Sequence, residues 1–108
     1  MKHVIVEPGV CGFKTDVTAE AFGDDDEMVN VTVCTKCHNI SKMMDDLGHE
    51  LNTYEVLGLL GERPLLENAR DNYPVHAACA VISGITKCIE AEAGLALPRD
   101  ASIHFVDE

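Results

Sequence analysis

The chain has 108 residues, of which 46% are hydrophobic, and a formal net charge of −11. This length and apolar content fit one compact domain over residues 1–108 and exclude an intrinsically disordered chain. Because 19 acidic residues oppose 8 basic ones, binding to nucleic acid or to anionic membranes is unfavourable.

A cytoplasmic location is expected from the N-terminus and from the hydropathy. Residues 1–8 resemble a strand rather than a signal peptide, and no apolar run reaches the roughly 18 residues that cross a bilayer. A reducing compartment keeps the five cysteines free. Each cysteine is then a buried apolar residue, a metal ligand or a reactive thiol.

Three strands are predicted in the first third of the chain. Residues 3–7 form a short stretch rich in β-branched side chains. Residues 14–22 and 28–34 alternate between apolar and polar side chains, and this alternation is typical of a half-buried strand. The polar turn 23–27 joins the second and third strands into a hairpin.

Helical spacing follows, and a last strand ends the chain. Thr35 can cap the first helix and Gly48 ends it. The order indicates an α+β fold, with helices on one face of a mainly antiparallel four-stranded sheet. The predicted helices cover residues 37–47, 53–60, 65–73 and 75–94, and the last strand covers residues 101–106.

Chain direction brings two cysteine segments together. In a meander, the loop with Cys11 and the end of the third strand, followed by Cys37, lie at the same edge of the sheet. Cys79 joins them if the last strand runs parallel to the first, because the preceding helix then runs in the opposite direction. If the last strand runs the other way, Cys79 lies at the far end.

The local sequence favours a binding site at these thiols. Cys37 and Cys79 lie in the first turn of predicted helices, where free N–H groups and the helix dipole favour a thiolate. Gly9 and Gly12 flank Cys11 and allow backbone amides to approach a ligand closely. Such a pocket suits an anion, a metal ion held by thiolates, or a nucleophilic sulfur.

Two spacings supply further candidate ligands. Cys34 and Cys37 form a C-x-x-C pair, which can chelate zinc or iron or act as a dithiol; the alternative is a chance pair, with Cys34 pointing away from the core. His76 and Cys79 lie one predicted helical turn apart. They could be two ligands of one metal ion, or the pair could be an exposed histidine beside a half-buried cysteine. Cys88, about 180° round the helix from Cys79, is predicted to pack in the core.

Together, several stretches resemble an uncharacterised family of short cysteine-containing proteins from anaerobic bacteria and archaea, catalogued as a domain of unknown function. The stretches are Pro8–Phe13 (P-G-V-C-G-F), Cys37–Ile40, and His76–Cys79 leading to Gly94–Pro98. The resemblance spans nearly the whole chain. Ala80 departs from the family pattern, in which a proline tends to follow the third cysteine.

The resemblance implies an anaerobic host and a three-thiol site formed by Cys11, Cys37 and Cys79, but no established activity. The first functional hypothesis is that these thiols bind zinc or an iron–sulfur cluster, with His76 or Cys34 as a fourth ligand. The second is a thiol redox protein or thiol-nucleophile enzyme that uses Cys37, or Cys79 assisted by His76, as the low-pKa thiol and Cys34 as a resolving partner. The third is a homo-oligomeric interaction module whose cysteines are structural.

Overall fold

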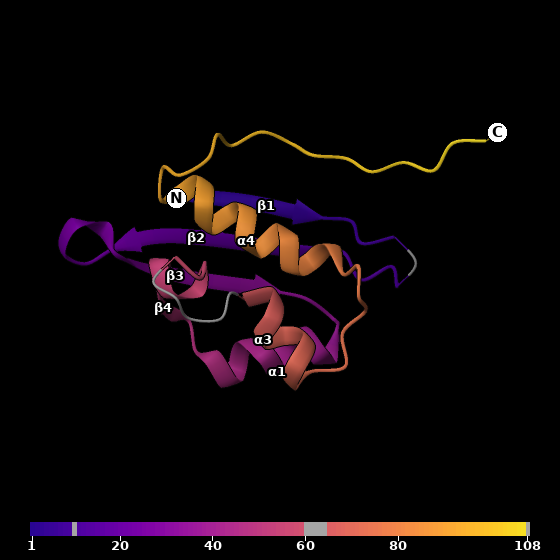
Figure 1. The fold of residues 1–108 in the computed structure, drawn as a ribbon, viewed down its shortest axis with the longest axis horizontal. Helices are drawn as coiled ribbons and strands as arrows, with labels where there is room; N and C mark the ends of the chain where they lie inside the picture. Colours follow the sequence, from indigo (N-terminus) through magenta and orange to yellow (C-terminus); the bar gives the residue numbers. More distant parts are fainter. Residues whose placement is uncertain (10, 60–64, 108) are drawn as a thin grey trace.

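The computed structural model describes residues 1–9, 11–59 and 65–107 and contains a four-stranded antiparallel sheet (Figure 1). Its strands lie side by side in the order β1-β2-β3-β4. This confirms the predicted α+β class and the antiparallel meander. The strands are β1 Lys2–Val6, β2 Thr15–Phe22, β3 Met28–Cys34 and β4 Glu50–Asn52.

The identity of the fourth strand corrects the prediction. It is β4, where Leu51 pairs with Val29 of β3, and not residues 101–106, which are exposed and belong to no strand. A strand of three residues is too short to show a periodic pattern, so the sequence does not predict it. Residues 101–106 alternate as a strand does, but within the described residues they pair with no other strand.

The described residues contain four α-helices, which follow or interrupt the strands, and a 3₁₀ turn, Asp24–Asp26, in the β2–β3 hairpin. The second helix is shorter than predicted, and residue 60 of the predicted helix lies outside the described residues. The helix start is capped by the Asn52 side chain, which accepts hydrogen bonds from the N–H groups of Tyr54 and Glu55. The last helix begins at Ala80 rather than residue 75. The helices are α1 His38–Leu47, α2 Thr53–Val56, α3 Leu65–Asn72 and α4 Ala80–Glu92.

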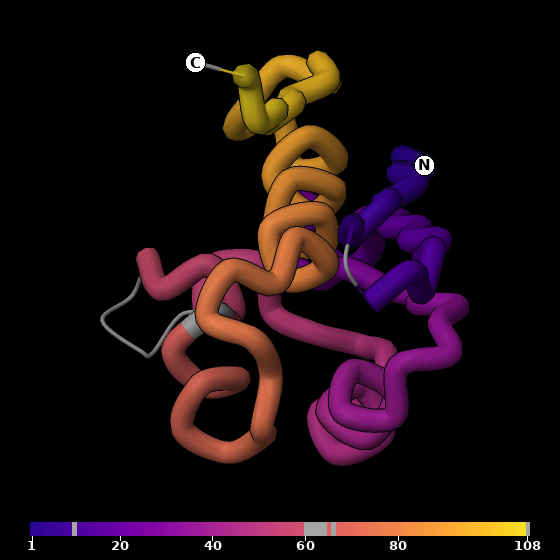
Figure 2. The backbone as a smooth tube through the Cα atoms, turned by 90° about the vertical axis from the view of Figure 1, so that its right-hand side faces the viewer, coloured from indigo at the N-terminus to yellow at the C-terminus, as the bar shows by residue number. Residues whose placement is uncertain are grey.

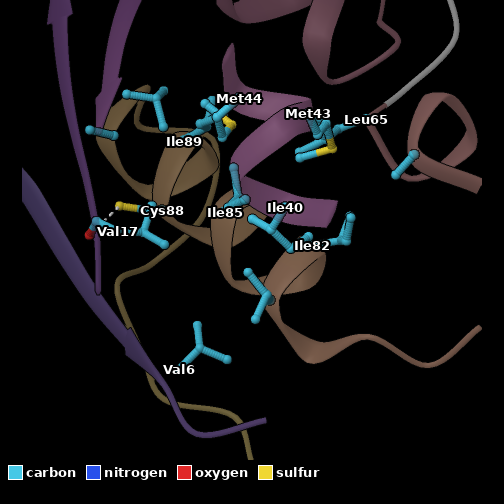
Figure 3. Packing of buried hydrophobic residues seen from close by; sticks show 14 of the residues in the cluster. Val6, Val17, Ile40, Met43, Met44, Leu65, Ile82, Ile85, Cys88 and Ile89 are labelled. Carbon is cyan, nitrogen blue, oxygen red and sulfur yellow. Dashed lines mark hydrogen bonds between the residues drawn. The ribbon is translucent and has the colours of Figure 1, made fainter. Parts of the chain in front are cut away.

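The core lies between one face of the sheet and the helices (Figure 3). Alternate residues of the strands point inward, and they pack against apolar side chains of α1 and α4, whose helical spacing places those side chains on one face. The opposite face of the sheet carries mostly exposed side chains. None of the helices within the described residues is long and apolar enough to cross a membrane. Buried members of the core include Val17, Ala19, Val29, Val31, Ile40, Met43, Ile82, Ile85 and Ile89.

The direction of α4 follows from contacts at its end. The Glu92 carboxylate accepts the N–H of Ala21 at 2.8 Å and lies 3.4 Å from the Met1 amino group. Since Met1 precedes β1 and Ala21 lies near the end of β2, α4 ends where β1 begins. Its first residues therefore lie where β1 ends (Figure 1).

Gly84 determines how closely α4 approaches β1. A Cβ atom at this position would lie 2.3 Å from Cγ2 of Val6, which is far inside van der Waals contact. Val6 is buried and β-branched, so its side chain has few other rotamers to adopt.

We predict that Gly84→Ala destabilises the protein by about 1–2 kcal/mol. Overpacking costs about 1–3 kcal/mol, and a contact this far inside van der Waals range falls in the upper part, about 2–3 kcal/mol. The higher helix propensity of alanine offsets about 1 kcal/mol of this cost. Urea unfolding measures the difference. The exposed neighbour gives the matched control, because Ser83→Ala changes the propensity without the contact and should be neutral or slightly stabilising. Equal stability of the wild type and Gly84→Ala would show that α4 does not lie this close to β1.

Candidate functional site

The three cysteine-bearing segments lie at one end of the molecule. They are the β1–β2 connection, the β3–α1 connection and the segment before α4, at the right-hand end of Figure 1 and facing the viewer in Figure 2. The direction of α4 thus meets the condition that the sequence left open for Cys79, although the last strand on which that argument relied does not form. Cys11, Cys37 and Cys79 are all half-buried free thiols.

Cys37 and Cys79 occupy the same position relative to their helices. Each is the residue that precedes the first helical turn, with φ −73° and ψ 115° at Cys37 and φ −63° and ψ 111° at Cys79. Neither side chain makes a capping hydrogen bond, and both residues pack against the core. The first N–H groups of a helix have no partner within the helix, so unpaired backbone donors directly follow each of these cysteines in the chain.

Cys11 lies in a tight turn that two glycines make possible. Gly9 and Gly12 have φ values of 87° and 69°, a conformation that side-chain-bearing residues rarely adopt. The Gly12 N–H donates to the Gly9 carbonyl at 2.9 Å. A Cβ atom at either glycine would meet nothing within 4 Å, so backbone conformation, and not a close approach within the chain, requires glycine here.

A chain of hydroxyl groups links the Cys11 loop to the start of α1. The Cys37 N–H donates to the Thr35 hydroxyl at 3.1 Å, the hydroxyls of Thr35 and Thr15 are 2.9 Å apart, and Thr15 donates to the Phe13 carbonyl at 2.8 Å. Because a hydroxyl has only one proton, Thr35 must donate to Thr15. Thr35 was predicted to cap the helix; it instead holds the N–H of Cys37, one residue before the helix begins.

Other hydrogen bonds connect α1 to the segment before α4. The Asn39 side-chain amide donates to the Pro74 carbonyl at 3.2 Å, and the Tyr73 hydroxyl donates to Asp46 at 2.7 Å. Arg70 of α3 donates to the Ala77 carbonyl at 3.0 Å. The residues before Cys79 are thereby attached to the helix that begins after Cys37.

The two proposed fourth ligands occupy different places. Cys34 pairs with Asp16 and is exposed on the open face of the sheet, whereas Cys37 packs against the core. The exposed His76 is not one helical turn from Cys79, because α4 begins only at Ala80; a bond of 3.1 Å from the Cys79 N–H to the His76 carbonyl closes a turn instead.

Cys88 lies in the core, as its place on the buried stripe of α4 predicts. Its sulfur is 3.4 Å from the Lys2 carbonyl oxygen and 3.7 Å from that of Val17, toward which it points in Figure 3. Burial, reinforced by the nearby Glu92 carboxylate, raises the pKa of this thiol. Cys88 is therefore a protonated packing residue at neutral pH, remote from the other thiols.

Within the described ranges, no three His, Cys, Asp or Glu side chains are placed so that they could hold a metal ion together. The three half-buried cysteines thus share an end of the molecule without forming a closed ligand set. Sequence reasoning missed the residues that connect their segments, Thr15, Asn39 and Tyr73. A signal existed for Thr15 alone, as a polar residue on the apolar face of its strand.

Comparison with known proteins identifies the family of the chain but assigns it no activity. A family model described as a family of unknown function (DUF6951) matches residues 2–105. No curated protein and no solved structure matches the chain.

We predict that Thr15→Val destabilises the protein by about 1–3 kcal/mol, because the substitution at this buried position leaves the part-buried Phe13 carbonyl and Thr35 hydroxyl without their partner. Chemical denaturation measures the loss. Thr18→Val, in the same strand but on the open face, is the control and should change stability by less than about 0.5 kcal/mol. Equal effects of the two substitutions would contradict a structural role for the hydroxyl chain.

A second prediction concerns pH. The hydrogen bond from Tyr73, with help from Lys42, lowers the pKa of Asp46, and the same bond raises the pKa of Tyr73. Stability from Asp46 is therefore complete above the ordinary carboxyl pKa and is lost as the pH falls through the lowered pKa. Stability from Tyr73 is complete below the ordinary phenol pKa and is lost as the pH rises through the raised pKa.

Tyr73→Phe should raise the Asp46 pKa toward its ordinary value, as followed by the carboxyl carbon signal in an NMR titration. The matched control is Tyr54→Phe, which removes the hydroxyl of the other tyrosine, which is exposed, and should leave the Asp46 pKa at its wild-type value. An Asp46 titration that Tyr73→Phe leaves unchanged would show that this bond does not form in solution.

Proposed function

Because the chain belongs to this family of unknown function, we propose its role from the geometry alone: it holds a zinc ion or an iron–sulfur cluster through Cys11, Cys37 and Cys79. Thiolates are the ligands that both groups prefer. A reducing cytoplasm would keep the three sulfurs available for this purpose.

The observation that carries the proposal is the convergence of three thiol-bearing segments at one end of the fold. The Cys11 loop and the start of α1 are connected through Thr15 and Thr35, and α1 is connected to the segment before α4 through Asn39. Three segments far apart in sequence thus carry one thiol each to the same region. A cysteine that only packs in the core, such as Cys88, does not require other segments to bring thiols to the same region.

Metal binding would require the three cysteine sulfurs to move closer together. Cys37 and Cys79 sit at the starts of two helices anchored in the core, whereas Cys11 lies in a turn outside the sheet. The turn around Cys11 is therefore the part that has to move, until the three sulfurs lie about 2.3 Å from a shared zinc ion. His76, three residues before Cys79 and exposed, is the better placed fourth ligand, because Cys34 faces the other side of the sheet.

The experiment is a metal analysis of full-length protein purified without oxygen. We expect zinc, or iron with acid-labile sulfide and visible absorption, in the wild type or after reconstitution. Cys11→Ser, Cys37→Ser and Cys79→Ser should each lower the bound metal at least tenfold. Cys34→Ser is the matched control, since it removes an exposed thiol outside the proposed site and should retain the metal.

Two results would refute the metal site. One is wild-type protein that remains free of metal after reconstitution with each candidate. The other is equal metal loss in Cys34→Ser and Cys37→Ser, which would indicate nonspecific binding to thiols. Circular dichroism of every variant separates loss of a ligand from loss of the fold.

The open ligand set favours a second candidate, thiol–disulfide exchange between Cys37 and Cys79. In this reaction the two thiols lose two electrons and two protons to a disulfide partner, which is reduced to two thiols. Peptide mapping after treatment with oxidised glutathione tests it. A Cys37–Cys79 disulfide in protein that takes up no metal would support exchange, and two glutathione adducts without that disulfide would exclude it.

A further inference from the structure

The C-terminal tail, defined as residues 94–107, exposes large apolar side chains along one segment. The exposed fraction is 97% for Ile103, 78% for Val106 and 70% for Leu97, and Phe105 is fully exposed. Figure 1 shows the tail leaving the end of α4 and running alongside the molecule without joining the sheet. Several large apolar side chains exposed together mark an interaction site more often than a free surface.

The backbone of the tail is equally unpartnered. Its last hydrogen bond joins the Arg99 N–H to the Leu97 carbonyl, and no described residue from 100 to 107 makes another. Ile103 and Phe105 alternate with Ser102 and His104. This is the pattern of a strand with one covered face.

The sheet offers an edge of matching length. In the order β1-β2-β3-β4, β1 has a neighbour on one side only among the strands of the described residues. It spans five residues, and Ile5 on its open face is 54% exposed. An edge strand presents unpaired N–H and C=O groups, which act as a template for a strand from another chain.

We propose that two copies of the chain form a dimer in which the tail of each copy pairs, as an added strand, with the free edge of β1 of the other. In the single chain the tail and β1 remain apart, although α4 ends beside Met1. A second copy presents the same free edge and receives a tail in return.

The exposed area favours this reciprocal arrangement over an unrelated partner. Leu97, Ile103 and Phe105 fall on one side of this alternation and together carry on the order of 400 Å² of surface. One tail docked alone, counted with the surface that it covers, buries on the order of 800 Å² in total, which is below the ~1,200 Å² of a stable interface. Two exchanged tails, with the strand surfaces that they cover, reach that range.

The test is sedimentation velocity of the full chain at increasing concentration, in reductant so that no disulfide links copies. The wild type should dimerise. Ile103→Asp with Phe105→Asp should weaken dimerisation at least tenfold, because both charges lie on the covered side of the added strand. Ser102→Asp with His104→Asp is the matched control, since it adds acidic side chains to the other side and should preserve the dimer.

Hydrogen exchange identifies the edge that is used. In the wild type, exchange of the β1 amides should slow as concentration rises, and in the Ile103/Phe105 variant it should stay fast at every concentration. A wild type that is monomeric throughout, a dimer of equal affinity in that variant, or β1 protection independent of concentration, which would mean pairing within one chain, would each overturn the proposal.

Discussion

The contact between α4 and the β1–β2 pair determines at which end of the sheet the third candidate cysteine lies. Gly84 lets the helix backbone approach Val6 closely, and Glu92 attaches the other end of the helix to Met1 and Ala21. These contacts set the direction of α4, and its direction decides where its first residue lies. If the helix ran the other way, Cys79 would lie at the end of the sheet where β1 begins, far from Cys11 and Cys37.

Much of the sheet was predictable because it depends on local alternation. The β2–β3 hairpin follows from Val17 and Ala19 on one strand and Val29 and Val31 on the other, which form a single apolar face. The short β4 was not predictable in this way, since its three residues show no period and become a strand only by pairing with β3. The start of α4 was also misplaced, because the helical period of residues 75–79 does not reveal that the Cys79 N–H closes a turn.

The candidate site shows a similar division. The sequence located Cys11, Cys37 and Cys79, because glycine flanks and helix starts are local features. It could not give the hydroxyl chain through Thr15 and Thr35, which joins residues 20 positions apart in sequence. Nor could it give the bond from Asn39 to Pro74, which spans 35 positions. Contacts of this kind depend on tertiary packing, which a single sequence does not reveal.

The position of Cys34 has a practical consequence for handling the protein. It is the exposed cysteine among the five thiols, and it lies on the flat, uncovered side of the sheet. In air, such a sulfur is readily oxidised and can join two molecules covalently, sheet to sheet. Preparations stored without reductant would then contain a linked species unrelated to any native assembly, and Cys34→Ser would remove that artefact at its source.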